Sequence, residues 1–340
     1  MTRARFDLTR TQVLAFRRAA QSLDKRLPAG PKSLRRAAWA GLQDSMPRAA
    51  VLSIHARVEE TQPSTWEDPS LVQLWGLRYS VYVVPAQDRA LFTLGRLLDD
   101  DRGRRRAEDL ATRLEALLKG RKVTDRDAAD RLGGIGNGIR YAAPSGRVLI
   151  RWEGARAPIV WSVPAPNTNP REAALELARR YLHVFGPATP DAFGVWAGIG
   201  SAAGRAAFDG LSTSLAATST PIGEGWILAS DEAAFRAAAG PAAAARLLPS
   251  GDTYFLLQGA DRELLVPDAR RRGALWTTRV WPGAVLVAGE IVGTWRRAGP
   301  AVTVQTWRRL TRQERDAIAA EAESLPLAGI EGQIRVRWDG

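Results

Sequence analysis

The chain has 340 residues, a formal net charge of +12 and no cysteine. Without a thiol it has no disulfide bond, thiolate zinc site, iron–sulfur cluster or cysteine nucleophile. A multi-histidine metal centre would need both of its histidines, His55 and His183, together with carboxylates from distant segments, so we expect no metal site and no cofactor. No run approaches the roughly 18 apolar residues of a membrane span, and the N-terminus is charged where a signal peptide is apolar. We therefore expect a cytoplasmic protein that does not enter a membrane.

The positive charge is the most informative property of the composition. Lys and Arg together number 48 against 36 Asp and Glu, and only four of the 48 are lysines. A GC-rich genome explains the choice of Arg over Lys, but it does not explain the surplus of positive charge. A soluble chain this basic most often binds a polyanion. Double-stranded DNA is therefore the leading candidate partner.

Residues 1–98 are predicted to form helices followed by a strand. Apolar residues recur at steps of three and four near the N-terminus, which is typical of an amphipathic helix, and a run of β-branched and aromatic residues near residue 80 indicates a strand. The expected elements are helices Leu8–Leu23, Leu34–Leu42 and Arg48–Val58, a helical stretch after Pro63 that contains Trp66, and a strand Arg78–Val84. Helices that end in a strand predict a first winged-helix domain.

Residues 99–166 are predicted to form a second winged-helix domain. The charged run Asp99–Arg106 is interpreted as a linker, and Thr124 is a good N-cap for a helix. The expected elements are helices Ala107–Lys119 and Thr124–Leu132, a hairpin of strands Arg147–Trp152 and Ile159–Val163, and a closing linker Pro164–Asn167.

Residues 167–230 have the clearest pattern in the chain. A helix is expected over Pro170–Phe185, and Thr189 caps a second helix whose first residue, Pro190, stands where proline is best tolerated. A third helix follows over Ser201–Leu211, with a glycine turn before it. This spacing is typical of a helix-turn-helix. Two strands, Leu215–Thr220 and Gly225–Ala229, would complete a third winged-helix domain.

Residues 231–340 are predicted to be rich in β-structure. The expected elements are strands Tyr254–Leu257, Ala284–Val287, Glu290–Trp295 and Ala301–Trp307, a helix Arg312–Leu325 and a final strand Gln333–Trp338. The predicted fold class is α+β, with tandem winged-helix (helix-turn-helix) domains and a β-rich C-terminal domain that forms a small curved sheet or partial barrel.

Three stretches in this order resemble one known family: Trp39–Ala50, Tyr181–Pro190 and Gly289–Arg296. They are similar to the bacterial winged-helix DNA-binding family that includes the AlkZ-like (YcaQ-type) DNA glycosylases, and the resemblance covers nearly the whole chain. It implies a scaffold curved around duplex DNA. It also implies the removal of alkylated bases, in some cases of bulky adducts or crosslinks attached at purine N7.

The resemblance places the catalytic candidates at Gln43, Asp44 and Ser45. The family's motif is Gln, an apolar residue, then Gln or Asp, at the end of the second helix of the first domain. Gln43 matches its first position, Asp44 stands where an apolar residue is usual, and Ser45 occupies the third position. Cleavage of an N-glycosidic bond builds oxocarbenium character on the sugar, so an amide or carboxylate that holds a water near C1′ would assist it. We expect Gln43 to orient that water, assisted by Asp44 or Ser45.

Structural roles are open for the same residues. Asp44 or Ser45 could instead cap the helix that begins near Pro47. His55 lies further along that helix, where it either faces the same cavity or is an ordinary helix histidine with its hydrogen bonds satisfied. His183 has no partner that the sequence reveals, and we assign it no function.

Five arginines are the candidates for DNA contact. Arg147, Arg151 and Arg156 lie on or beside the second predicted hairpin, Arg205 lies on the second helix of the helix-turn-helix, and Arg296 follows the Gly289 turn. Each neutralised phosphate should steepen the salt dependence of binding by about one unit in log-log slope. The neighbouring Trp295 is either a wedge against DNA or a core residue.

Two functions from different classes remain. The first is a DNA-binding glycosylase of base excision repair that hydrolyses the N-glycosidic bond of alkylated purines. The second is a winged-helix DNA-binding protein that lacks this activity. A transcription regulator would need dimers, and no zipper or dimerisation helix is present, so we expect a monomer.

Overall fold

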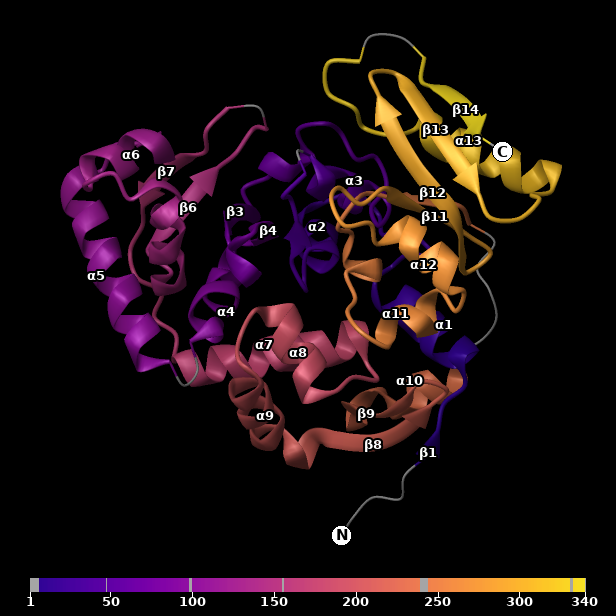
Figure 1. Cartoon of the computed structure of the whole chain (residues 1–340), viewed down its shortest axis with the longest axis horizontal. Helices are drawn as coiled ribbons and strands as arrows, with labels where there is room; N and C mark the ends of the chain where they lie inside the picture. Colours follow the sequence, from indigo (N-terminus) through magenta and orange to yellow (C-terminus); the bar gives the residue numbers. More distant parts are fainter. Residues whose placement is uncertain are drawn as a thin grey trace.

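The computed structural model describes residues 6–46, 48–97, 100–154, 156–238, 244–330 and 333–339, and within them the fold is α+β. Figure 1 shows helices and small sheets following one another around the molecule, with the residues near 100–165 at one end and the C-terminal sheet at the other. Helices α7 and α8 lie between these ends. No helix in the described ranges is long and apolar enough to cross a bilayer.

The first part of the chain carries the predicted motif on a strand and not on a helix. The elements are β1 (Phe6–Asp7), α1 (Arg10–Ala20), α2 (Pro31–Ala37), β2 (Leu42–Gln43), α3 (Ala49–His55), β3 (Leu71–Trp75), β4 (Val81–Pro85) and α4 (Arg89–Thr93). Sheet order is β2-β4-β3. The predicted helix Leu34–Leu42 is wrong at both ends, because Pro31 starts α2 early and Gly41, with φ of +78°, ends the turn that follows it. The helical stretch predicted after Pro63 is one short turn, Thr65–Glu67, and strand β3 was missed.

The second part packs two helices against a hairpin. Its elements are α5 (Asp101–Leu118), β5 (Val123–Thr124), α6 (Asp125–Arg131), β6 (Val148–Arg151) and β7 (Ile159–Ser162). The predicted linker Asp99–Arg106 is wrong from residue 101 onward: the Asp100 side chain accepts the Gly103 N–H at 2.7 Å and so starts α5. Asp99 lies outside the described residues. The predicted hairpin and the Thr124 cap are confirmed.

The third part agrees with prediction almost residue by residue. Its elements are α7 (Pro170–Phe185), α8 (Pro190–Ala197), α9 (Ser201–Gly210), β8 (Leu215–Thr220) and β9 (Gly223–Leu228). Asn169 and Thr189 cap α7 and α8, and Gly198, with φ of +70°, ends α8. Strand β8 pairs with β9 on one side and, in parallel, with β1 from the start of the chain on the other.

The last part holds a five-stranded sheet in the order β10-β11-β12-β13-β14. Its elements are α10 (Glu232–Ala237), β10 (Arg246–Leu248), α11 (Asp261–Leu265), α12 (Ala269–Leu275), β11 (Gly283–Val287), β12 (Glu290–Ala298), β13 (Ala301–Thr306), α13 (Arg312–Glu323) and β14 (Arg335–Asp339). The predicted strand Tyr254–Leu257 is wrong. Asp252 accepts the Tyr254 N–H at 2.9 Å and bends Thr253–Phe255 into a 3₁₀ turn.

The core joins parts of the chain that are far apart in sequence. One continuous apolar cluster includes Leu14 of α1, Tyr82 of β4, Trp196 of α8 and Phe255. Because these side chains pack together, the segment after β2, the end of α8 and the segment around residue 255 are held in fixed positions around Gln43.

Candidate active site and nucleic-acid interface

Gln43 is held in place by the pairing of β2 with β4. Gln43 lies opposite Tyr82, and Leu42 lies opposite Val83 in an antiparallel register. Successive side chains of an extended segment point to opposite sides. Gln43 and Ser45 accordingly line a surface cavity, whereas Asp44 between them is buried.

This cavity, called here the Gln43 cavity, has a volume of about 320 Å³. Its walls come from β2 and the residues after it, from the β3–β4 turn, and from two segments of the last part of the chain. The lining residues are Gln43, Ser45, Met46, Arg78, Ser250, Gly251, Leu256, Gln258, Arg279, Val280 and Trp281. Gly251, with φ of +75°, faces the Gln43 side chain, and a Cβ at Gly251 would lie 3.6 Å from Gln43 Cδ.

Arg78 fixes the orientation of the Gln43 amide. Its Nη2 donates to Gln43 Oε1 at 3.2 Å and to Tyr82 Oη at 3.0 Å, and its Nη1 donates to the backbone oxygen of Trp196 at the end of α8. A guanidinium only donates, so the amide oxygen faces Arg78 and the amide NH₂ points away from it. In the described part of the chain, Gln43 Nε2 makes no hydrogen bond of its own.

The backbone that presents Arg78 is strained. Arg78 and Tyr79 are consecutive non-glycine residues in the left-handed region, with φ of 54° and 57°. Gly198 packs directly against this turn, since a Cβ at Gly198 would lie 2.8 Å from Arg78 Cγ and 3.0 Å from Arg78 Cα. Each such residue costs roughly 1 to 3 kcal/mol and persists only where its surroundings hold it, most often at functional sites.

Asp44 supports the segment and does not line the cavity. Only 1% of its surface is exposed, and its carboxylate accepts the Ala50 N–H of α3 at 3.0 Å and Gln73 Nε2 at 2.8 Å. Gln73 in turn accepts the N–H of Trp152 from the β6–β7 hairpin. Burial raises the pKa of Asp44 to about 6. Of the two structural roles considered from sequence, the structure assigns the helix cap to Asp44.

The Gln43 cavity is positively charged. Arg78 and Arg279 line it, and neither guanidinium has a carboxylate within 4.0 Å among the described residues. No Asp or Glu is among its described lining residues. Two guanidiniums close together without a carboxylate attract anions.

A second hollow continues from the Gln43 cavity toward strand β12. It shares Met46, Ser250, Val280 and Trp281 with the cavity and ends at Arg296 and Arg297. Both arginines are exposed, and neither forms an ion pair within the described residues. Arg296, expected to contact DNA, therefore lies near Gln43. Trp295 is a core residue, 5% exposed, whose Nε1 donates to the Leu248 backbone oxygen at 2.8 Å.

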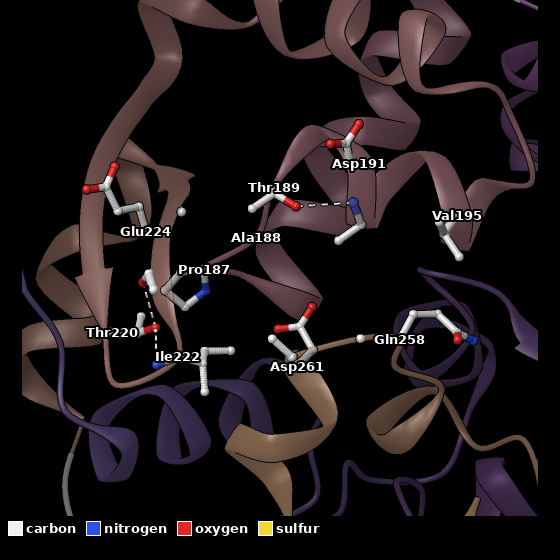
Figure 2. Close-up of a pocket in the computed structure, with 15 residues that line it drawn as sticks. Pro187, Ala188, Thr189, Asp191, Val195, Thr220, Ile222, Glu224, Gln258 and Asp261 are labelled. Carbon is white, nitrogen blue, oxygen red and sulfur yellow. Dashed lines mark hydrogen bonds between the residues drawn. The ribbon is translucent and has the colours of Figure 1, made fainter.

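A third hollow, of about 290 Å³, has the opposite charge (Figure 2). It shares Gln258 with the Gln43 cavity, and its walls are mostly apolar with Asp191, Glu224 and Asp261 among them. In Figure 2, Gln258 and Asp261 enter from one segment, and Thr189 and Asp191 from the beginning of α8. Asp261 pairs with the buried Arg17 at 3.1 Å. No arginine or lysine is among the described lining residues, so this hollow offers a phosphate no cation.

The other expected DNA contacts lie away from the Gln43 cavity, and most of them are ion-paired. Arg147 contacts Glu108 at 3.2 Å and also Glu115, both on α5. Arg151 contacts Glu67 at 3.1 Å and Glu153 at 2.5 Å. Arg156 is exposed on the β6–β7 connection. Arg205 is exposed on α9, where it contacts Asp191 at 3.4 Å.

Both histidines contact residues of the protein interior and lie outside the Gln43 cavity. His55 is buried, its Nε2 lies 3.1 Å from Ser324 Oγ, and burial together with Arg26 and Arg246 lowers its pKa to about 3. It does not line the Gln43 cavity. His183 Nδ1 lies 2.8 Å from Asp231, and its ring packs edge-on against Phe16 and Trp39. Among the described residues, no group of three or more acidic or histidine side chains is placed to hold a metal ion.

Sequence reasoning missed Arg78 and Arg279 as site residues. Arg78 was placed at the start of a strand, and no motif marks it, because its importance comes from the end of α8, which is more than a hundred residues away in sequence. Arg279 lies in the segment between α12 and β11 with nothing in its neighbours to distinguish it from other arginines.

Comparison with known proteins gives one family and one fold. Residues 36–326 match the family described as DNA glycosylase AlkZ-like. A solved structure, the DNA glycosylase AlkZ of Streptomyces sahachiroi, superposes with a TM-score of 0.79 at 20% sequence identity, covering 98% of this chain and all of that one. At this identity the match shows a shared fold. No curated protein sequence matches.

Proposed function

The chain belongs to the AlkZ-like DNA glycosylase family, and from this membership we propose that it binds duplex DNA and hydrolyses the N-glycosidic bond of alkylated purines. The observation that carries the proposal is the placement of Gln43. It faces a cavity that adjoins four arginines without carboxylate partners in the described chain: Arg78, Arg279, Arg296 and Arg297.

The proposal includes the domain organisation. Residues 1–98, 99–166 and 167–230 each combine helices with an antiparallel strand pair, β3–β4, β6–β7 and β8–β9, as winged-helix domains do. Residues 231–340 would then be the β-rich C-terminal domain, which brings the five-stranded sheet beside the DNA. The protein would work on DNA as a monomer in the cytoplasm.

The reaction needs one water and no cofactor. An N7-alkylated purine carries a positive charge, so its N9 leaves readily with the electron pair of the C1′–N9 bond and the base becomes neutral. The water oxygen forms the new bond to C1′, and one water proton passes to solvent. What the protein supplies is position and charge, because the developing oxocarbenium ion is stabilised by fixed dipoles and by negative charge beside it.

Gln43 and Ser45 are the residues proposed to contact that water. Arg78 directs the Gln43 amide so that its NH₂ faces the cavity and its oxygen keeps one lone pair for a water proton. The Ser45 hydroxyl can both donate and accept a hydrogen bond. Asp44 acts through the backbone: by capping α3 it holds the segment that carries Gln43 and Ser45.

The test is base release from a duplex that carries one 7-methylguanine. Purified protein is added in excess, and alkali then cuts the strand wherever the base is missing. We expect a strand break at the lesion and none in the matched undamaged duplex. A duplex with a bulky N7 adduct is assayed in parallel. Binding of both duplexes without a break in either would contradict the proposal.

One observation favours the second function, a DNA-binding protein without glycosylase activity. The third motif position is Ser45, and the one carboxylate of the motif, Asp44, turns into the protein toward α3. If catalysis requires a protein carboxylate at C1′, the Gln43 cavity lacks it. Binding that is insensitive to alkylation, with no loss of base, is the result that this second function predicts.

A further inference from the structure

The Gln43 cavity has the wrong charge for its proposed reaction if only the protein is considered. An oxocarbenium ion is positive, and so is an N7-alkylated purine. Among the residues that the structure describes, two guanidiniums, Arg78 and Arg279, line the cavity and no carboxylate does. A negative charge must therefore enter the site together with the DNA.

We propose that the Gln43 cavity binds one phosphodiester group of the strand that carries the damaged base, between Arg78 and Arg279, and that this phosphate lies beside C1′, where it offsets part of the positive charge of the two arginines. The inference rests on the proposed function and deepens it. DNA then contributes the charge that the motif would provide with a carboxylate in the position of Ser45.

Arg78 is held in a fixed orientation that suits the binding of a phosphate. All of its hydrogen bonds in the described chain go to uncharged acceptors, namely the oxygens of Gln43, Tyr82 and Trp196. Its positive charge therefore stays uncompensated, while its orientation is determined before DNA arrives. The guanidinium keeps N–H donors that these bonds do not use. A phosphate contacted by such a preorganised fork is held with less loss of side-chain entropy than by a flexible arginine.

Arg279 supplies the second contact, from a side chain that other described residues do not hold in place. It is exposed, lies in the segment that connects α12 to β11, and makes no hydrogen bond or ion pair within the described residues. Binding a phosphate costs it no existing partner. By contrast, Arg147 and Arg151 would each have to give up two glutamates.

The neighbouring hollow supports the choice of ligand. The hollow of Figure 2 shares Gln258 with the Gln43 cavity, and no arginine or lysine is among its described lining residues, so it offers a phosphate no cation. The hollow that shares Met46, Ser250, Val280 and Trp281 with the Gln43 cavity contains Arg296 and Arg297 instead. A DNA backbone that enters the cavity is therefore expected to run toward β12 and away from the hollow of Figure 2.

The experiment replaces one phosphate at a time by a neutral methylphosphonate on either side of a 7-methylguanine. Single-turnover base release is measured with saturating protein. At one position the substitution should slow release at least about tenfold. Arg78→Gln should cause a larger loss with the all-phosphate duplex, because it also releases the Gln43 amide. It should cause almost no further loss when that phosphate is replaced, because the contact to it is already gone.

A second variant, Arg279→Gln, keeps the proposal testable if Arg78→Gln fails to fold. Arg279→Gln removes a side chain without partners in the described chain, so it should fold normally and give the same non-additive pattern with a smaller loss, about threefold. Arg312→Gln is the matched control: its side chain is 96% exposed on α13, outside the cavity, and release should stay unchanged.

Two results would overturn the phosphate site: every methylphosphonate leaves release within about twofold of normal, or the losses from substitution and variant multiply. If wild-type protein releases no base at all, the glycosylase proposal fails separately. The phosphate site is then judged by affinity for the same duplexes, where the methylphosphonate should weaken binding to wild type and not to Arg279→Gln. Equal weakening of both proteins would refute it.

Discussion

The arginines around the Gln43 cavity and those around strand β6 differ in their partners. At the cavity, Arg78, Arg279, Arg296 and Arg297 have no carboxylate partner among the described residues. At β6, Arg147 and Arg151 each contact two glutamates. Each of these arginines adds the same charge to the net total, whether or not it has a carboxylate partner. Arg147 and Arg151 can accept a phosphate only by giving up these glutamates, whereas the four cavity arginines break no ion pair.

This difference shows why net charge alone cannot locate a DNA interface. Exposed ion pairs contribute little to stability, typically below about 1 kcal/mol, yet they reduce the free energy gained when DNA binds, because the glutamates must be displaced. The two regions also touch: Gln73 accepts a hydrogen bond from Trp152 of the hairpin and donates one to Asp44, next to Gln43. The hairpin can therefore support the cavity without itself contacting DNA.

The largest expected effect on base release comes from removing Gln43 in the cavity, and removing a paired arginine should have almost none. Gln43→Ala should lower single-turnover base release by about 100-fold, the usual loss when one preorganised catalytic contact is removed. DNA affinity should fall by no more than about fivefold, since one hydrogen bond contributes about 1 kcal/mol. Arg147→Gln, assayed beside it, should release base at close to the normal rate. Equal losses of release and affinity in Gln43→Ala would point to a structural role.

Asp44, the buried carboxylate that accepts a hydrogen bond from Gln73 and so joins the two regions, can be tested through the pH dependence of unfolding. The pKa of Asp44, about 6, is raised above the ordinary value near 4, so its burial makes folding less favourable as pH rises from about 4 to 6 and adds no further change above that. Wild-type protein should therefore lose about 3 kcal/mol relative to Asp44→Asn between pH 4 and pH 7, measured by urea unfolding. Comparing the two variants cancels His55, whose lowered pKa acts in the opposite direction. A difference that does not vary with pH would contradict this description of Asp44.

A pair of glycines separates backbone strain from contact with Arg78. Gly198 ends α8 and Gly120 follows Lys119, the C-cap residue of α5; both glycines are in the left-handed region, with φ of +70° and +78°. Alanine should cost each site about 1 kcal/mol in unfolding free energy. Only Gly198→Ala pushes a Cβ against Arg78, so only this variant should also slow base release, by roughly fivefold; at Gly120 nothing lies within 4 Å. Equal activity of the two variants would mean that the position of Arg78 does not matter.

The smallest expected effect compares the arginines directly. Arg279→Gln and Arg296→Gln should each reduce the log-log slope of DNA affinity against salt by about one unit. Arg147→Gln should change the slope by clearly less, because its glutamates compensate its charge before DNA binds. Fluorescence anisotropy at several salt concentrations gives all three slopes. A larger change for Arg147 than for Arg279 would reverse the proposed assignment of the two regions.

Local signals in the sequence predicted the third part of the chain best. Pro170 begins α7 and Gly186 ends it, and Thr189, Pro190 and Gly198 bound α8, so local signals placed both helices correctly; the Asn169 cap of α7 is visible only in the structure. The charged run before Arg106 was taken as a linker, although Asp100 caps a helix there. The strand β2 could not be recognised from two residues, because only its pairing with β4 makes it a strand.

In the candidate site, too, the sequence indicated some residues and only the long-range contacts of the fold revealed the others. Resemblance to the family indicated Gln43 and Ser45, and both line one cavity. Arg78 and Arg279 were not foreseen, since a long-range hydrogen bond to Trp196 and the fold of the last part of the chain bring them there. Similarly, no pattern in the sequence distinguishes the unpaired Arg296 from the paired Arg147. Whether an arginine is paired depends on residues from other elements.

The measurement closest to the central claim is mass-spectrometric detection of free base after one turnover. A duplex with one 7-methylguanine, fully bound by wild-type protein, should release one equivalent of 7-methylguanine and leave an uncut strand with an abasic site. A bound duplex that keeps its methylated base, and keeps a bulky N7 adduct as well, would contradict the proposal that the glycosidic bond is hydrolysed in the Gln43 cavity.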